Sequence, residues 1–326
     1  SLFRSGIRTG VPLEIPQGAE AEYWKKLRFP PTGAQKRVLL EIGKDMRAER
    51  PMARLVQGDV GCGKTAIAFG AMLMAVQAGA QAALMAPTEV LARQHYESAR
   101  ELFEPMGISV GILTGSMTAK GHREAHAAIA QGDWQVIIGT HALITEKVQY
   151  AHLGLVVTDE QHRFGVRQRS MLGEKGDSPN VLVMSATPIP RTLSLILYGD
   201  LDISIVDELP PGRTPVRTRI VPPDKREDMY GFLRREVHAG RQVYVVCPLV
   251  EESEAVEAVS AEQVYAELSE KKLKDLRVAL VHGRQKSVEK DEILEQFRRG
   301  EWDVLVSTTV IEVGVNVPNA TVMVIE

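Results

Sequence analysis

The chain has 326 residues, of which 44% are hydrophobic and 25% charged, and its formal net charge at pH 7 is -3. This length exceeds that of one small domain, and the near-neutral charge means that any surface for nucleic acid must be local rather than global. The two cysteines, Cys62 and Cys247, lie far apart, which argues against a disulfide framework, and no apolar run approaches the length of a membrane span.

Apolar runs of strand length alternate with helix-length segments over the first two thirds of the chain. Helices are expected at 64–77 and 90–103 in particular. Near-continuous apolar strands separated by helices indicate a parallel sheet that is covered on both faces. The expected strands are 53–56, 81–86, 108–113, 135–138, 153–158, 181–184 and 203–206.

A stretch rich in Pro and Gly, residues 207–215, interrupts this pattern, and we interpret it as a hinge. After it the alternation resumes, with helices expected near 224–238, 261–271 and 287–298. The further strands are expected at 216–220, 242–246, 277–281, 304–307 and 321–325.

The sequence therefore predicts an extension over residues 1–26, a first α/β lobe over 27–206, a hinge over 207–215 and a second, partial lobe over 216–326. The chain starts at Ser1 without a methionine and stops on an apolar run. Both ends are therefore expected to be cut points in a longer protein.

A phosphate-binding loop is the first motif that carries chemistry. The segment Gly58-Asp-Val-Gly61-Cys-Gly63-Lys64-Thr65 matches G-x-x-x-x-G-K-[ST] and lies between an expected strand and an expected helix. Backbone N–H groups around the glycines and at the start of the helix can surround phosphate oxygens. Lys64 would neutralise the outer phosphates and Thr65 would hold Mg²⁺, so ATP with Mg²⁺ is the predicted cofactor.

Two acids follow another apolar run. Asp159 and Glu160 come at the end of the strand expected at 153–158. A phosphate loop requires a second acid for Mg²⁺, a role predicted for Asp159, and a neighbouring carboxylate can orient the attacking water, a role predicted for Glu160.

Beyond these two motifs, the chain resembles the RecG family of superfamily two helicases over nearly its whole length. Motif II is represented by Asp159-Glu-Gln-His-Arg-Phe-Gly165, and motif III by Ser185-Ala-Thr187-Pro188. The other matching segments are Phe29-Pro-Pro-Thr-Gly-Ala-Gln35, Ala86-Pro-Thr-Glu-Val-Leu-Ala-Arg93-Gln-His95, Gly139-Thr-His-Ala-Leu143, Val281-His-Gly-Arg284 and Thr308-Thr-Val-Ile-Glu-Val-Gly314-Val-Asn316-Val-Pro318.

This resemblance implies two RecA-like parallel-sheet lobes of a P-loop NTPase, the second ending before the family's motif VI. It implies further nucleotide contacts by Phe29, Gln35, Gln161, Gly314 and Asn316, the last standing where the family commonly has aspartate. It implies that His162, Ser185 and Thr187 couple the nucleotide to DNA. The DNA contacts that it implies are Thr88, Arg93, Thr114, Gly115, Thr140, His141, Arg284 and Thr308.

The function that the resemblance implies is ATP-dependent translocation on duplex DNA, which remodels stalled replication forks and branched DNA in recombination and repair. A monomeric motor in the bacterial cytoplasm, at the nucleoid, is expected. Its DNA contacts would be independent of sequence, it would have no membrane partner, and it would contact single-strand-binding protein through regions outside this chain. Because the arginines of motif VI are absent, the chain alone is expected to bind ATP but hydrolyse it slowly.

Three alternatives remain open. A transcription-repair coupling translocase usually has Asp-Glu-Glu-His in motif II, where this chain has Gln161. An RNA helicase of the same superfamily is disfavoured by the extension Arg163-Phe-Gly165. A non-catalytic DNA-binding scaffold with a relic fold is disfavoured by the intact Lys64, Asp159 and Glu160.

Overall fold

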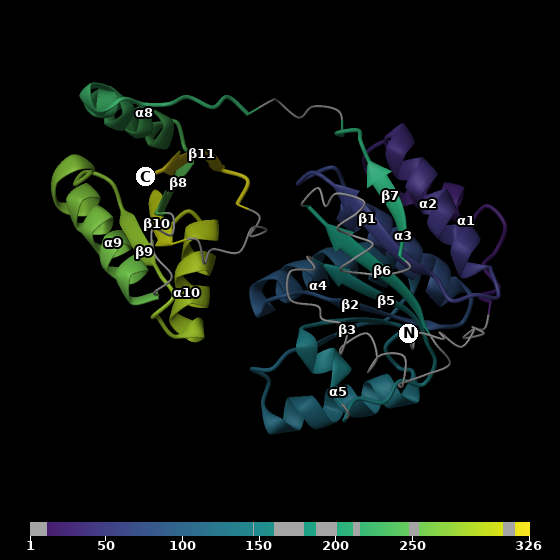
Figure 1. Ribbon diagram of the computed structural model, residues 1–326. Helices are drawn as coiled ribbons and strands as arrows, with labels where there is room; N and C mark the ends of the chain where they lie inside the picture. The colour runs from purple at the N-terminus through teal and green to yellow at the C-terminus, as the bar shows by residue number, and fades with distance from the viewer. Residues whose placement is uncertain are drawn as a thin grey trace, which may run out of the picture. The chain divides into compact units, whose positions relative to one another are not determined.

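The computed structural model describes residues 12–145, 147–159, 179–186, 201–210, 216–247, 254–308 and 317–326. The chain forms two compact units, Ser1–Thr214 and Pro215–Glu326 (Figure 1). Each unit contains a parallel sheet, as the alternation of strands and helices predicts. The expected fold class of two α/β lobes with parallel sheets is therefore confirmed.

The sheet of unit 1 has seven strands in the order β3-β4-β2-β5-β6-β1-β7, and each described pair of neighbours is parallel. All seven strands expected from the sequence are present, with ends that differ by a residue or two. Their bounds are β1 Ala53–Gly58, β2 Gln81–Met85, β3 Val110–Leu113, β4 Val136–Gly139, β5 Leu153–Asp159, β6 Asn180–Ser185 and β7 Asp202–Val206.

Successive residues of a strand point to opposite faces of the sheet. Both faces of this sheet are apolar, so helices cover each of them. Ala82 and Leu84 of β2 pack in one apolar cluster, whereas Ala83 between them packs in a second cluster on the other face. The first cluster contains residues of α1 to α4, and the second contains residues of α5 and of the short turn η2. The bounds are α1 Ala19–Lys26, α2 Gly33–Met46, α3 Lys64–Gln77, α4 Glu89–Phe103, α5 Ala119–Gln131, η1 Glu104–Met106 and η2 His141–Ile144.

The amino-terminal segment was expected to be an extension that precedes the first lobe. Over its described part, from residue 12 on, it packs into the core of unit 1, where Tyr23 is fully buried and Trp24 is 8% exposed. The Tyr23 hydroxyl donates to the backbone oxygen of Ala66 on α3 over 2.5 Å. Two aromatic side chains bury enough apolar area to hold α1 against α2 and α3, so the described residues 12–26 pack with unit 1.

Unit 2 has a sheet of four strands in the order β11-β8-β10-β9, all parallel. Tyr230 and Leu233 of α8 pack on one face, and Phe297 of α10 packs in a separate cluster with Ala279 and Leu305. The bounds are η4 Pro223–Lys225, α8 Arg226–His238, β8 Gln242–Cys247, α9 Glu254–Glu267, η5 Leu268–Lys272, β9 Val278–Val281, α10 Ser287–Arg298, β10 Val304–Thr308 and β11 Ala320–Ile325.

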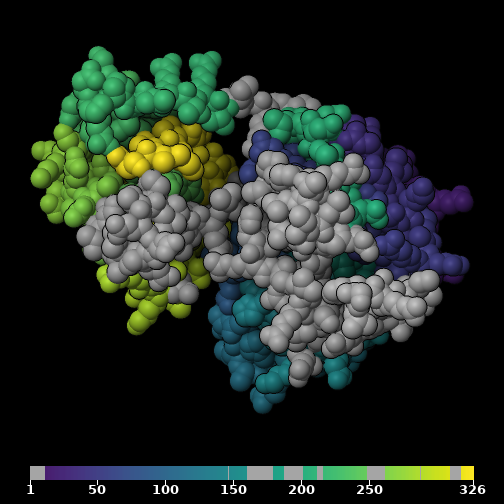
Figure 2. All heavy atoms as spheres, in the orientation of Figure 1, coloured from purple at the N-terminus to yellow at the C-terminus, as the bar shows by residue number. Residues whose placement is uncertain are grey.

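The strand β11 lies at one edge of this sheet, and in Figure 2 its atoms, in yellow, are visible at the surface of unit 2. Met323 and Ile325 are 61% and 70% exposed, whereas Val322 and Val324 pack against the core. This alternation shows that β11 is covered on one face only.

The strand expected at residues 216–220 is absent, and that expectation was wrong. The described segment is irregular, and Val216 and Ile220 are 91% and 96% exposed. The alternation of Val, Thr and Ile with Arg is typical of a strand, but strand propensity does not form a ladder without a neighbouring strand to pair with. Among the residues that the structure describes, no helix is both long and apolar enough to cross a membrane.

Candidate functional site

The candidate site lies at the carboxyl edge of the sheet in unit 1. Because all the strands run in one direction, the residues that follow them gather at this edge, where open α/β sheets bind their ligands. The phosphate loop follows β1, Asp159 ends β5 and Ser185 ends β6. In the strand order, β1, β6 and β5 are neighbours, so these residues share one half of the edge.

The phosphate loop connects β1 to α3, as the motif requires. Gly61 and Gly63 have φ angles of 76° and 89°, in the left-handed region that favours glycine. Gly63 is the residue from which α3 starts, so the N–H groups of the first helical turn face the loop. Lys64 Nζ donates to the backbone oxygens of Gly58 and Asp59 over 2.7 and 3.0 Å, and Thr65 is half-buried in the first turn of α3.

The base of the loop is tightly packed. A Cβ on Gly58 would lie 2.6 Å from Cys62 Sγ and 3.0 Å from the backbone oxygen of Val206. Burial raises the pKa of the Cys62 thiol, although the nearby charge of Lys64 opposes this. Cys62 therefore stays a neutral packing residue, and the loop tolerates only glycine at position 58.

Gln35 connects α2 to the loop. Its Oε1 accepts from the Thr32 backbone N–H over 2.9 Å and its Nε2 donates to the Cys62 backbone oxygen over 2.8 Å, while the side chain is 1% exposed. With the bond from the Gln35 N–H to Thr32 Oγ1, this forms a capping box at the start of α2. Phe29, just before α2, is 49% exposed. Contact of either residue with adenine stays a prediction.

Asp159 has a partner that the sequence reasoning missed. His95 Nε2 lies 2.6 Å from Asp159 Oδ2, and the two side chains are only 10% and 15% exposed. His95 comes from α4 and is buried beside apolar residues of the same helix, including Leu91 and Ala99. A polar residue on the buried face of a helix was the sequence signal that could have indicated a hydrogen-bonded role.

The other half of the edge carries the residues expected to contact DNA. Thr88 and Arg93 follow β2, Thr114 and Gly115 follow β3, and Thr140 and His141 follow β4, three adjacent strands. The structure brings these six residues together at one edge, with Arg93, Gly115 and His141 exposed.

The threonines of this group are less accessible. Thr114 and Thr140 are 1% and 3% exposed, and the buried Thr140 hydroxyl has no hydrogen-bond partner within the described ranges. Thr88 Oγ1 accepts from the Leu91 N–H and thereby caps α4. Thr114 and Thr140 are buried and the Thr88 hydroxyl already accepts a hydrogen bond in the helix cap, so the backbone N–H groups and Arg93 are the better donors to a phosphate.

Glu89 is a second residue that the sequence reasoning did not single out. Its carboxylate accepts from the Ser116 N–H over 2.8 Å and from the Ser116 hydroxyl. This joins the start of α4 to the loop that follows β3. The two segments expected to contact DNA are therefore held together by one charge-assisted pair of hydrogen bonds.

In unit 2, the candidate residues also follow parallel strands. Arg284, after β9, is exposed, whereas Thr308, at the end of β10, is 1% exposed. Three buried polar atoms here have no hydrogen-bond partner among the residues that the structure describes, namely His282 Nδ1, Ser307 Oγ and Thr308 Oγ1. The roles assigned to Glu160, Gln161, His162, Thr187, Gly314 and Asn316 fall on residues outside those that the structure describes.

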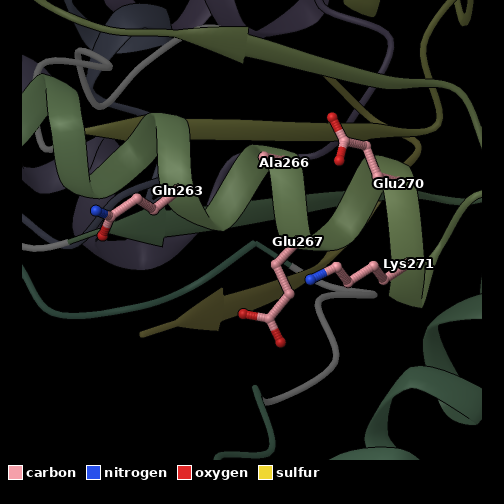
Figure 3. Close-up of a pocket in the computed structure, with 5 residues that line it drawn as sticks. All are labelled: Gln263, Ala266, Glu267, Glu270 and Lys271. Atoms are coloured by element: carbon pink, nitrogen blue, oxygen red, sulfur yellow. The ribbon is translucent and has the colours of Figure 1, made fainter.

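The surface of unit 2 has a hollow along one helical segment. Figure 3 shows its lining residues, which come from consecutive turns of α9 and η5: Gln263, Ala266, Glu267, Glu270 and Lys271. These residues are three and four apart along the continuous helical segment that α9 and η5 form, and no other described element contributes a side chain to this lining. It is a solvated helix face and not a built site.

Two helicase families match the chain. The DEAD/DEAH box helicase family matches residues 32–196, and the helicase conserved C-terminal domain matches residues 224–326. The first match covers the phosphate loop and Asp159, and the second begins within unit 2.

Curated relatives and a solved structure are also similar. The ATP-dependent DNA helicase RecG of Synechocystis sp. is 53% identical over 92% of this chain and 36% of its own length. RecG of Escherichia coli is 52% identical over 97% of the chain and 46% of its own length. The structure of RecG bound to a three-way DNA junction has a TM-score of 0.82 at 44% identity, covering 97% of this chain and 41% of that one. The chain thus spans less than half the length of these relatives.

Proposed function

The chain belongs to the DEAD/DEAH box helicase family, and from this premise we propose that it is the motor core of an ATP-dependent translocase that remodels branched duplex DNA. One observation carries the proposal: Lys64, Thr65 and Asp159 lie at the same sheet edge as the exposed Arg93 and His141. The high identity to RecG, including a RecG described as bound to a three-way DNA junction, supports branched DNA as the substrate.

In the proposed nucleotide site, Lys64 pairs with the outer phosphates and the loop N–H groups bind the remaining phosphate oxygens. The Thr65 hydroxyl and the Asp159 carboxylate are oxygen ligands, the type that Mg²⁺ prefers, so the residues present fit this ion. When bound, Mg²⁺ would neutralise charge on the phosphates. Glu160 would orient the attacking water, and Phe29, Gln35, Gln161, Gly314 and Asn316 would complete the contacts to the nucleotide.

In the proposed DNA contact, phosphates are bound by the strand ends of unit 1 and by Arg284 and Thr308 of unit 2. Such contacts give no sequence preference because every nucleotide carries the same phosphate. Ser185, which is buried at the end of β6, together with His162 and Thr187, would couple the state of the nucleotide to the grip on DNA.

The division into two lobes joined by a hinge at 207–215 is also part of this proposal. We also propose that the protein acts as a monomer, contacts single-strand-binding protein through regions outside this chain, and lies at the bacterial nucleoid.

The test is nucleic-acid-stimulated ATP hydrolysis by the full-length protein that contains this chain. We expect a three-way DNA junction to stimulate hydrolysis more than linear duplex DNA, and duplex RNA to stimulate it little. Stimulation by RNA in preference to DNA would favour the RNA helicase alternative. Absence of hydrolysis with every nucleic acid would favour a non-catalytic scaffold.

A further inference from the structure

We infer that His95 is a positioning residue that holds the Asp159 carboxylate in place for Mg²⁺, so that α4 joins the proposed DNA contact to the metal ligand. This inference deepens the proposed function and rests on it. His95 would touch neither nucleotide nor metal and would act only through Asp159.

The sheet register brings the two residues together. Strands β2 and β5 are paired neighbours, with Met85 opposite Thr158, so Asp159 ends β5 beside the chain that leaves β2. That chain turns into α4 after Thr88, and His95 lies on the buried face of this helix. The 2.6 Å contact between His95 Nε2 and Asp159 Oδ2 is thus set by rigid elements and not by a loop.

The chemistry of the contact assigns the roles. An ionised carboxylate can only accept hydrogen bonds, so His95 Nε2 carries the hydrogen and donates it. A carboxylate has about four lone-pair positions, so one such bond leaves capacity for a metal ion. A hydrogen-bonded carboxylate ligand is restricted in rotation, which lowers the entropic cost of binding the metal.

Packing alone does not account for a histidine at this position. The neighbouring buried positions of α4 are Leu91, Ala92, Ala99 and Phe103, and an apolar residue at position 95 would continue that face. Burying an imidazole among them is unfavourable unless its N–H groups are hydrogen-bonded. The bond to Asp159 supplies that compensation and also fixes a residue of the proposed metal site.

Helix α4 also connects the contact between His95 and Asp159 to the residues expected to bind DNA. The same helix is capped by Thr88 and carries the exposed Arg93, both expected to contact DNA. A shift of α4 on contact with DNA would therefore move the donor to Asp159. The structure offers a short physical path from DNA to the metal ligand within unit 1.

The experiment measures Mn²⁺ as a spectroscopic substitute for Mg²⁺ in the full chain. Binding of a fluorescent ATP analogue is titrated with Mn²⁺ and also in EDTA, and bound Mn²⁺ is counted by electron paramagnetic resonance. The variants are His95→Ala, His95→Asn and His95→Gln, with Glu101→Gln at an exposed position of α4 as the matched control. Glutamine can place its N–H₂ near the position of histidine Nε2, whereas the shorter asparagine cannot.

We expect His95→Ala and His95→Asn to weaken Mn²⁺-dependent binding by about 10–100-fold, the usual effect of losing a partner of a metal ligand. Binding in EDTA should be unchanged, and His95→Gln and Glu101→Gln should bind Mn²⁺ like the unaltered chain. Such a pattern would separate the hydrogen bond from packing, because alanine and asparagine fail where glutamine succeeds.

Three results would overturn the inference. Unchanged Mn²⁺ affinity in His95→Ala and His95→Asn would remove His95 from the site. An equal loss of Mn²⁺ affinity in His95→Gln would mean that packing, and not the hydrogen bond, causes the effect. If His95→Ala does not fold, the comparison of His95→Gln with His95→Asn still distinguishes the two causes. Equal loss in EDTA would mean that the phosphate loop itself is disturbed. A failure of the unaltered chain to bind nucleotide at all would instead refute the proposed function, and the inference with it.

Discussion

Lys64 is the residue on which nucleotide binding depends most directly. Its ammonium donates to the backbone oxygens of Gly58 and Asp59, so the charge is held within the phosphate loop. We expect Lys64→Ala to weaken ATP binding by about 10–100-fold, because a hydrogen bond to a charged group contributes about 1.5–3 kcal/mol. Equilibrium titration with a fluorescent nucleotide measures this, with Lys44→Ala on the exposed side of α2 as the control. Equal affinity in Lys64→Ala and Lys44→Ala would exclude Lys64 from the site.

Glu160 is the residue whose substitution should distinguish ATP binding from ATP hydrolysis. In the full-length protein, Glu160→Gln should keep ATP affinity and reduce DNA-stimulated turnover by about 10²–10⁴-fold, the usual contribution of a positioned acid or base. This corresponds to about 3–5 kcal/mol of activation free energy. Steady-state hydrolysis and nucleotide titration on the same samples provide the comparison. Turnover within a factor of about three of the unaltered protein would limit Glu160 to a structural role, since that factor lies far below the range for acid–base catalysis.

Asp303, just before β10, is hydrogen-bonded to Arg277, just before β9, and thereby joins two strands of unit 2. Arg277 Nη2 lies 2.6 Å from Asp303 Oδ1, and the Arg277 backbone N–H donates to Asp303 Oδ2 over 2.8 Å. Burial alone would raise the pKa of Asp303, but the hydrogen bonds and charge of Arg277 outweigh it, and the pKa is lowered in the folded chain. The ionised carboxylate therefore stabilises unit 2 above the unfolded pKa, and this stabilisation is lost as the pH falls through the lower folded pKa.

We expect Asp303→Asn to lower the stability of unit 2 by about 1–2 kcal/mol near pH 7, a value reduced because the Arg277 side chain is 57% exposed. The difference from the unaltered chain should shrink below about pH 4, near the pKa of an unperturbed Asp. Hydrogen exchange of the β9 and β10 amides at several pH values measures the effect. Glu301→Gln removes an exposed partner of Arg299 and should have little effect. A pH-independent loss in Asp303→Asn would contradict the role of the charge.

At the scale of the whole molecule, the net charge of -3 means that attraction to DNA must come from local groups such as Arg93 and Arg284. If these groups contact phosphates, affinity should fall steeply with salt and vary by less than about 1–3 kcal/mol between unrelated sequences, the range of one bidentate base contact. Binding to duplexes of unrelated sequence at several salt concentrations measures both quantities. Arg93→Gln should lower the slope of log affinity against log salt by about 1. A larger sequence preference, or an unchanged slope, would contradict phosphate contact at Arg93.

The sequence by itself determined the local features of this protein. The phosphate loop, the acid at the end of β5, the parallel α/β class and eleven of the twelve expected strands could be predicted, and all eleven are present. Such features depend on residues close together in the chain. Glycines at positive φ, apolar runs and helix starts act through local backbone preferences that need no knowledge of distant contacts.

Only the tertiary structure decided which strands are neighbours. The strand order and the packing of the helices in turn decided the contacts that the sequence did not predict. The pairing of β2 with β5 brings His95 to Asp159, and the packing of α2 brings Gln35 to the loop. The same limit explains the wrong expectation for residues 216–220, which pair with no strand in the part of the chain that the structure describes. It also explains why packing of residues 12–26 was not foreseen, since it depends on the apolar partners of Tyr23 and Trp24. Strand order and docking depend on the sum of many long-range packing free energies, which no local pattern in the sequence contains.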